Sequence, residues 1–244
     1  MNILSIGNSF SQDAQRYLHQ IAKADGIDIR CFNLCIGGCS LSQHYQNMLS
    51  EERAYTLEMN GSSTGFHVSL KESLLNREWD IITVQQVSSQ SPNYDTYQPY
   101  LDRLVEYIRK FAPKAKIAIH QTWAYEQGSA RLNDELKYGD YKQMLGDLVK
   151  SYQKAAESIQ ADYMIPSGEV FGAMVESGIE KVHRDTFHAN LGIGRYALGL
   201  IWYKTLTGND VLKNTFCEFD EDVSTAQIAI AKKCVQAVAN RYEI

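Results

Sequence analysis

The sequence predicts an α/β protein whose doubly wound parallel sheet lies between two layers of helices. Short apolar runs of strand length recur along the 244-residue chain. Segments of helix length, with apolar residues on one side, stand between these runs. Such alternation is typical of a parallel sheet with helices on both faces. Because no internal repeat or low-complexity linker divides the chain, we expect residues 1–244 to form a single domain.

The expected elements follow from local patterns, beginning with a buried strand at 2–6 and an amphipathic helix at 12–24. Further strands are expected at 26–33, 79–85, 115–121 and 162–166. Further helices are expected at 95–111, 139–160, 167–177, 189–206 and 222–240. Residues 34–43 have the Gly and Ser density of a loop. Together these elements predict a three-layer α/β/α, flavodoxin-like arrangement with a sheet of about five strands.

One segment interrupts this alternation. Residues 54–69, "AYTLEMNGSSTGFHVS", contain two alternating runs around Asn60-Gly61. An Asn-Gly pair between two such runs is typical of a two-residue β-hairpin turn. We interpret the segment as a hairpin insertion that could form a flap.

Composition excludes several classes of protein. The net charge of −5 argues against a nucleic-acid partner, because phosphate binding requires a basic surface. No run of 18 or more apolar residues is present, so no membrane insertion is expected. The N-terminus has neither a basic region nor an apolar core of a signal peptide. We therefore expect a cytoplasmic protein, although a mature secreted or periplasmic chain would have the same sequence features.

The cysteines do not indicate a metal centre. There are five of them, and an odd number gives no complete disulfide framework. Cys31, Cys35 and Cys39 are spaced C-x3-C-x3-C, which matches neither zinc nor common iron–sulfur patterns. We expect reduced, buried thiols and no bound metal.

Polar and glycine residues follow the expected strands, at the edge where open parallel sheets bind ligands. In chain order these are Gly7, Asn8 and Ser9, then Gly37 and Gly38, then Gln85, Gln86, Ser88 and Ser89, then His120, Trp123 and Tyr125. A later segment, 183–199, adds Asp185 and His188. The candidate site is expected among these residues.

Ser9 admits three interpretations. It could cap the helix that follows, because Ser is favoured at that position. It could belong to a phosphate cradle, but the P-loop pattern is absent and no Lys or Arg lies between residues 2 and 15. It could be a nucleophile, which requires a base and a residue that orients the base. His188 and Asp185 could supply these, whereas Asp185 alone could also be a helix cap and His188 a surface residue.

Three blocks in chain order favour the nucleophile. Gly7-Asn8-Ser9, "NLCIGGCS" (33–40) and "DTFH" (185–188) lie on the expected elements in sequence order. In this the chain resembles the SGNH (GDSL-like) hydrolase superfamily, with Asn8 where Asp is usual. The resemblance implies that Ser9 is the nucleophile, His188 the general base and Asp185 the residue that orients it. It also implies an oxyanion hole formed by the amides of Ser9 and Gly38, with Gly37 as the adjacent alternative.

The sequence departs from the superfamily pattern at the third block. This block is normally G-x-N-D, whose Asn donates to the oxyanion, but "VQQVSSQS" (84–91) contains neither Gly nor Asn. We expect Gln85 or Ser88 to donate instead, with Gln86 and Ser89 as alternatives. The chain therefore resembles a poorly characterised branch of the superfamily.

The aromatic residues after the strand at 115–121 have two interpretations. His120, Trp123 and Tyr125 could bind substrate as a platform on which a sugar stacks, or they could pack at the rim or in the core. Adopting the first, we expect a serine ester hydrolase that removes a small acyl group, such as acetyl, from a carbohydrate or similar small ester. The partner would be a small-molecule or glycan ester, with no metal or cofactor.

Two other functions remain open on the sequence alone. The irregular third block favours a non-catalytic carbohydrate-binding protein on the same fold. A nucleotide-binding flavodoxin-like protein is the third alternative, although no phosphate motif supports it. The distance between Ser9 Oγ and His188 Nε2 separates the first prediction from the others, and catalysis requires about 2.6–3.2 Å.

Overall fold

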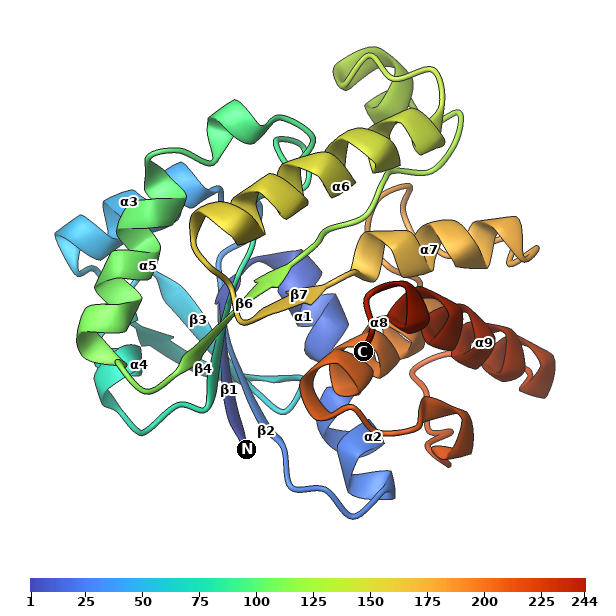
Figure 1. Cartoon of the computed structure of the whole chain (residues 1–244), viewed down its shortest axis with the longest axis horizontal. Coiled ribbons are helices and arrows are strands. Elements are labelled where there is room, and N and C mark those ends of the chain that lie inside the picture. Colours follow the sequence, from blue (N-terminus) through green and yellow to red (C-terminus); the bar gives the residue numbers. More distant parts are fainter.

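A seven-stranded sheet forms the centre of the computed structural model, which describes residues 1–244 (Figure 1). Its strands are arranged in the order β4-β3-β2-β1-β5-β6-β7. Five of them are parallel: β1 (Asn2–Gly7), β2 (Arg30–Cys35), β5 (Ile81–Val84), β6 (Lys116–His120) and β7 (Tyr163–Ile165). Their order, β2-β1-β5-β6-β7, is that of a flavodoxin-like sheet, as predicted.

The other two strands form the predicted hairpin. They are β3 (Tyr55–Met59) and β4 (Ser62–Val68), joined at Asn60 and Gly61, both of which have positive φ. Positive φ at both central residues is what a type I′ turn requires. The hairpin is not a flap, because β3 pairs antiparallel with β2 and extends the sheet. For the same reason the predicted number of five strands is wrong and the sheet has seven.

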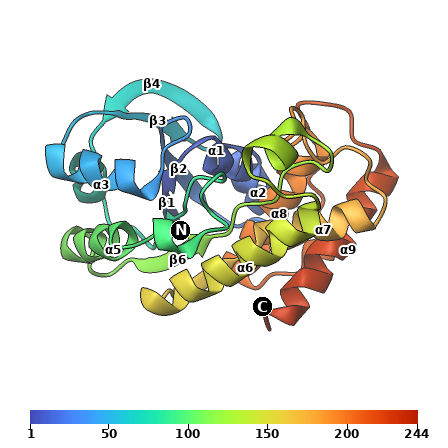
Figure 2. The ribbon, with the colours of Figure 1, turned by 90° about the horizontal axis from the view of Figure 1, so that it is seen from above.

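Helices cover both faces of the sheet (Figures 1 and 2). One layer, which includes the C-terminal helix, consists of α1 (Ser9–Gln15), α2 (Leu18–Ala24), α7 (Ser167–Glu176), α8 (Ile193–Thr207) and α9 (Thr225–Arg241). The opposite layer consists of α3 (Leu41–Ser50), α4 (Leu70–Leu75), α5 (Tyr100–Phe111) and α6 (Tyr141–Ser158). Short 3-10 segments, η1 (Tyr94–Thr96) and η3 (Val211–Lys213), and a π-helical segment, η2 (Arg131–Glu135), complete the chain.

The helix predictions differ from the structure in several places, and the helix expected at 95–111 begins only at Tyr100. The helix expected at 12–24 is divided into α1 and α2, and the helix expected at 189–206 begins at Ile193. Helices α3 and α4 were not expected. Helix α3 buries Leu41, His44 and Met48, which recur at helical spacing. Its N-terminus is fixed by Ser40, whose side chain accepts from the Gln43 amide.

The core joins both helical layers to the sheet in one cluster of 62 buried residues. Helix α8 is buried along nearly its whole length because it lies between α1, α2, α7 and α9. None of the helices combines the length and the apolarity that crossing a membrane would require. The carboxyl ends of β1, β2, β5 and β6 meet at one edge of the sheet, and the loops that follow them form the candidate site.

Candidate active site

Ser9 lies at a sharp turn between β1 and α1. Strand β1 ends at Gly7, and Asn8 is the N-cap of α1, with its side chain accepting from the Phe10 amide at 3.0 Å. Ser11 Oγ accepts from the Asn8 amide at 3.1 Å, which completes a capping box. The alternative in which Ser9 caps the helix is therefore wrong. Because Asn8 caps it, the Ser9 hydroxyl is free for another contact.

Of the three residues predicted as a triad, His188 lies within hydrogen-bond distance of both Ser9 and Asp185. Ser9 Oγ is 2.8 Å from His188 Nε2, and His188 Nδ1 is 2.8 Å from Asp185 Oδ2. An ionised carboxylate can only accept, so Nδ1 carries the ring proton and Nε2 is left to accept from Ser9. The Ser9–His188 distance lies within the predicted range.

The ionisation of Asp185 is set by opposing effects. Partial burial raises the pKa of its carboxyl group, but hydrogen bonds from the His188 ring and from the backbone N–H groups of His188 and Phe187 lower it more. The net effect lowers the pKa of Asp185 below its ordinary value. Asp185 is therefore an anion that holds one tautomer of His188.

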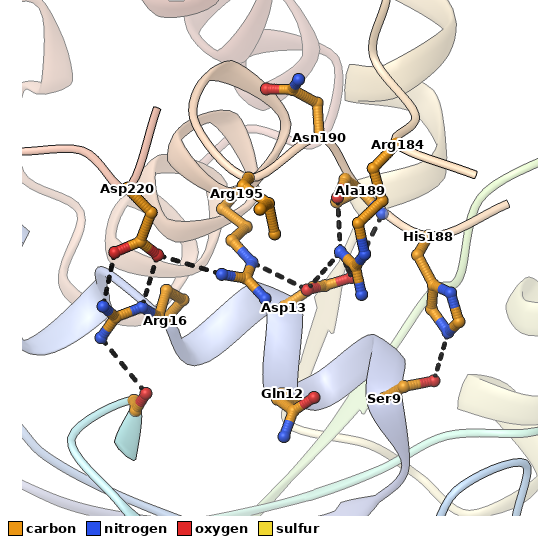
Figure 3. A network of polar contacts seen from close by, with 12 residues as sticks. Ser9, Gln12, Asp13, Arg16, Arg184, His188, Ala189, Asn190, Arg195 and Asp220 are labelled. Atoms are coloured by element: carbon orange, nitrogen blue, oxygen red, sulfur yellow. Dashed lines mark hydrogen bonds and ion pairs between the residues drawn. The ribbon is translucent and has the colours of Figure 1, made fainter. Parts of the chain in front are cut away.

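A buried ionic network fixes the segment that carries Asp185 and His188 (Figure 3). Asp13, four residues after Ser9 on α1 and fully buried, is its centre. Arg184 Nη1 donates to both Asp13 carboxylate oxygens at 2.9 Å and to the Ala189 carbonyl at 2.6 Å. The Ala189 amide donates to Asp13 at 3.1 Å. Asp13 thus holds the residues on both sides of the Asp185–His188 pair.

The network continues outward through a second carboxylate. Arg195 on α8 donates to Asp13 at 2.8 Å and to Asp220 at 3.0 Å. Asp220 also accepts from Arg16, and this hydrogen bond lowers the pKa of the Asp220 carboxyl group. The chain of alternating charges connects α1 to α8 beside the triad, as Figure 3 shows.

The turn between Asp185 and His188 is strained. Thr186 has a φ of 80°, a left-handed conformation that is costly for a β-branched residue. Its carbonyl accepts from the Glu126 amide at 2.8 Å, and the Phe187 carbonyl accepts from Trp123 Nε1 at 2.7 Å. The loop after β6 therefore holds this turn in addition to the contacts of Asp13.

Ser9 and His188 open onto a cleft of about 430 Å³. Gly38 lines it with a φ of 65°, which favours glycine, and its N–H has no hydrogen-bond partner within the protein. Ser88 and Ser89 also line the cleft, and Ser88 Oγ is 2.9 Å from the Tyr125 hydroxyl. Tyr125 also lines the cleft, so the structure brings Gly38, Ser88 and Tyr125 together with Ser9 and His188.

Gln85 is not placed to donate into the cleft. Its side chain is buried between Asn8 and His120, donating to Asn8 Oδ1 at 2.9 Å and accepting from His120 Nδ1 at 2.8 Å. Gln86 is likewise buried, and its amide donates to Thr96. The prediction that Gln85 replaces the missing Asn is wrong, because both ends of its side chain already have partners.

His120 and Trp123 do not form a platform for substrate. His120 is fully buried, and burial lowers its pKa to about 3, so the ring is neutral. Trp123 is fully buried and stacks on Phe10, with ring centroids 4.1 Å apart, and on Phe171. Both residues therefore pack in the core, which was the alternative interpretation. Of the three aromatic residues predicted to bind substrate, only Tyr125 lines the cleft.

Sequence reasoning missed three charged residues of the site. Asp13 could have been found from its i, i+4 spacing to Ser9, which places both on one face of a helix. Arg184 stands directly before Asp185, but nothing local indicates that it points to α1. Arg131, which lines the cleft, carries no motif. The structure contains no cluster of three His, Cys, Asp or Glu side chains that could hold a metal ion.

Comparisons with known proteins identify the family of this chain. A family model described as domain of unknown function DUF4886 matches residues 2–238. A crystal structure of a DUF4886 family protein from Bacteroides uniformis is 32% identical, with a TM-score of 0.91, and the match covers 100% of this chain and 95% of that one. No curated protein matches the chain.

More distant structures share the fold. A proposed SGNH hydrolase from Slackia heliotrinireducens is 20% identical with a TM-score of 0.60, over 84% of this chain and 98% of that one. A variant of an acetyl xylan esterase from Geobacillus stearothermophilus is 12% identical with a TM-score of 0.51, over 89% and 96%. At these identities the likeness concerns the fold, which is that of the SGNH hydrolases.

Proposed function

This chain belongs to the DUF4886 family, and from that premise and the geometry of its cleft we propose that it is a serine ester hydrolase on the SGNH fold. One observation carries the proposal. Ser9 Oγ, His188 and Asp185 form a continuous chain of two 2.8 Å contacts that opens onto a cleft. A nucleophile, a base and a residue that orients the base are what acyl transfer by serine requires.

The roles follow from the hydrogen bonds. His188 Nε2 accepts the Ser9 proton as Oγ attacks the ester carbonyl, and then returns it to the leaving alcohol. Water hydrolyses the acyl-serine by the same route in reverse. Asp185, already ionised, stabilises the imidazolium that forms between these steps. Because α1 starts at Ser9, its N-terminus presents a positive dipole end to the developing oxyanion.

The oxyanion hole is built from Gly38, Ser9 and Ser88. The Gly38 N–H has no partner within the protein, so it can donate to an oxyanion in the cleft. Tyr125 is buried, and Ser88 Oγ is its hydroxyl's hydrogen-bond partner. With the Tyr125 hydroxyl as donor in this pair, the Ser88 proton is left free to donate into the cleft. Ser88 then replaces the Asn of the usual third block, which defines an atypical branch of the superfamily.

We propose that the substrate is a small ester, in which the acyl group is acetyl and the alcohol is a carbohydrate. The fold shared with an acetyl xylan esterase supports this choice. The cleft, at about 430 Å³, has room for a small substrate. The structure gives less support than the sequence to a carbohydrate-binding protein without catalysis. Two of the three aromatic residues that were expected to bind sugar lie in the core.

Labelling with a fluorophosphonate tests the nucleophile. The wild-type protein is expected to form one adduct, located at Ser9 by mass spectrometry. Ser9→Ala should form none and should lower kcat/KM for 4-nitrophenyl acetate by at least about 10⁴-fold, since the triad acts as a unit. Ser50→Ala, which changes an exposed serine on α3, should match the wild type. Unchanged turnover in Ser9→Ala would exclude the mechanism, and glycan binding by a protein that hydrolyses no ester would favour the binding function.

A further inference from the structure

The cleft beside Ser9 carries one cationic side chain that the proposed mechanism does not use. Arg131, the first residue of η2, lines the cleft together with Ser9, His188 and Phe187. No Asp, Glu or Lys is among the lining residues. Arg131 is therefore the one permanently charged side chain among the lining residues.

The position of Arg131 is fixed by an aromatic ring rather than by hydrogen bonds. Its guanidinium carbon lies 4.1 Å from the centre of the Phe187 ring, a cation–π contact. The Phe187 ring packs in turn on the His188 ring, with centroids 3.9 Å apart. Arg131 is thus connected to the triad histidine through a single ring.

The guanidinium group has donors to spare. It forms an i,i+4 ion pair with Glu135 at 3.6 Å, which is too long for a hydrogen bond, and both side chains are substantially exposed, so the pair is weak. No hydrogen bond from Arg131 is found within the protein. Arginine offers five N–H donors in a planar fork that matches carboxylate and phosphate groups. Stacking on Phe187 holds that fork in place, so little side-chain freedom is lost when an anion binds.

We propose that Arg131 is a specificity-determining residue that binds an anionic group, a carboxylate or a phosphate, on the ester substrate. This inference rests on the proposed ester hydrolase function and names its substrate class: esters whose alcohol or acyl part carries a negative charge beside the reacting carbonyl. The anion pairs with the Arg131 fork while the carbonyl lies between Ser9 and Gly38.

Three aryl esters of similar shape test the proposal in the full-length protein: 4-acetoxybenzoate, 4-acetoxyphenyl phosphate and the neutral 4-acetoxybenzamide. Arg131→Gln should lower kcat/KM about 10- to 100-fold for one or both anions, because hydrogen bonds to charged groups are of that strength. The same change should alter the amide by less than about threefold. Comparing variant with wild type for each ester cancels differences between the leaving groups, and the two anions distinguish carboxylate from phosphate.

Two variants control for charge and geometry. Arg103→Gln removes an exposed arginine on α5, so it makes the same change in net charge away from the cleft and should leave all three rates unchanged. Arg131→Lys keeps the charge without the fork and should give an intermediate loss. Equal losses for the anionic and neutral esters in Arg131→Gln would overturn the proposal.

A binding measurement separates this inference from the hydrolase function. By NMR titration, 4-hydroxybenzoate or 4-hydroxyphenyl phosphate should bind at least about tenfold more tightly than 4-hydroxybenzamide, and Arg131→Gln should abolish the difference. If no ester is hydrolysed, the hydrolase proposal fails and this titration still decides the role of Arg131. Equal affinity for the anions and the amide would exclude an anion subsite.

Discussion

At the scale of single residues, the pair formed by Ser88 and Tyr125 decides how the cleft stabilises an oxyanion. Ser88→Ala removes the proposed hydroxyl donor and is expected to lower kcat about 10²–10³-fold, the usual effect of losing one such donor. Tyr125→Phe removes the hydroxyl that orients Ser88 and is expected to lower kcat less, by about three- to tenfold.

The measurement is kcat with 4-nitrophenyl acetate, and circular dichroism should show that both variants remain folded. Ser89→Ala distinguishes the neighbouring alternative, because Ser89 also lines the cleft. A rate for Ser88→Ala within twofold of the wild type would exclude Ser88 as an oxyanion donor.

Asn8 shows why this chain departs from the usual Asp of the first block. Its side-chain oxygen accepts from the Phe10 amide and from Gln85, and its side-chain nitrogen donates to the Cys39 carbonyl at 3.1 Å. A carboxylate could accept the first two bonds but could not make the third. Asn8 therefore joins the turn after β1 to the loops after β2 and β5, and Gln85 belongs to this joint instead of the oxyanion hole.

The site residues that could be predicted are those that the residue type and the order along the chain are enough to identify. Ser9, Asp185 and His188 were predicted together in this way, and the structure brings them within hydrogen-bond distance, while their catalytic roles remain predictions. The direction of the Gln85 amide could not be predicted, because it depends on Asn8 and His120, which only tertiary packing brings beside it.

At the scale of elements, helix α1 sets the spacing of the site. Ser9 and Asp13 are separated by about one helical turn and so lie on the same face of α1. One contacts His188 and the other contacts Ala189 and Arg184, so a single rigid element positions the nucleophile against the segment that carries its base. The strained Thr186 turn is held in register by these contacts.

Replacement of Asp13 tests this positioning role. Asp13→Asn leaves Arg184 and Arg195 without their buried partner and is expected to destabilise the fold by about 3–5 kcal/mol. It should also lower kcat about 10- to 100-fold at temperatures where the variant is fully folded, because His188 is displaced from Ser9.

Asp220→Asn is the matched control, since Asp220 is partly exposed and contacts arginines of the same network without touching the 184–189 segment. It should cost less stability and change kcat by less than about threefold. The rate of fluorophosphonate labelling separates the two roles. Normal labelling of folded Asp13→Asn would mean that Asp13 stabilises the fold without positioning the triad.

The elements themselves were predictable where local pattern and tertiary role agree. The hairpin around Asn60 and Gly61 follows from turn chemistry, but its pairing with β2 does not, because period-2 alternation says nothing about the neighbouring strand. Helix α3 was predictable in the same way, since its apolar residues recur at helical spacing after the cap residue Ser40. The Gly and Ser density of residues 34–43 instead favoured a loop.

At the scale of the whole molecule, the sheet and both helical layers share one apolar cluster. We propose on this basis that residues 1–244 form a single domain. Tryptophan fluorescence and far-UV circular dichroism should then report the same unfolding midpoint. The layers were predictable from the alternation of strands and helices, whereas the burial of polar groups inside them was not.

Three of these buried groups are histidines, and they make stability depend on pH. Burial lowers the pKa of His44 and His120 to about 3 and that of His183 to about 4, well below the 6.5 of an unfolded chain. Above pH 6.5 neither state binds protons at these rings. Between about pH 4 and 6.5 only the unfolded state does, so stability falls as the pH falls, by about 1.4 kcal/mol per pH unit for each ring.

Urea unfolding at pH 7, 6 and 5 measures this slope above the range in which most carboxyl groups titrate. The midpoint should decrease steadily towards pH 5. His44→Gln should reduce the dependence by about 1.4 kcal/mol per pH unit, because one fewer ring takes up a proton on unfolding. His67→Gln changes an exposed histidine on β4 and should leave the slope unchanged. If His44→Gln had the same slope as the wild type and His67→Gln, the prediction would be wrong, because His44 would then bind a proton as well in the folded state as in the unfolded state. The burial of His44 against Tyr55 opposes such binding.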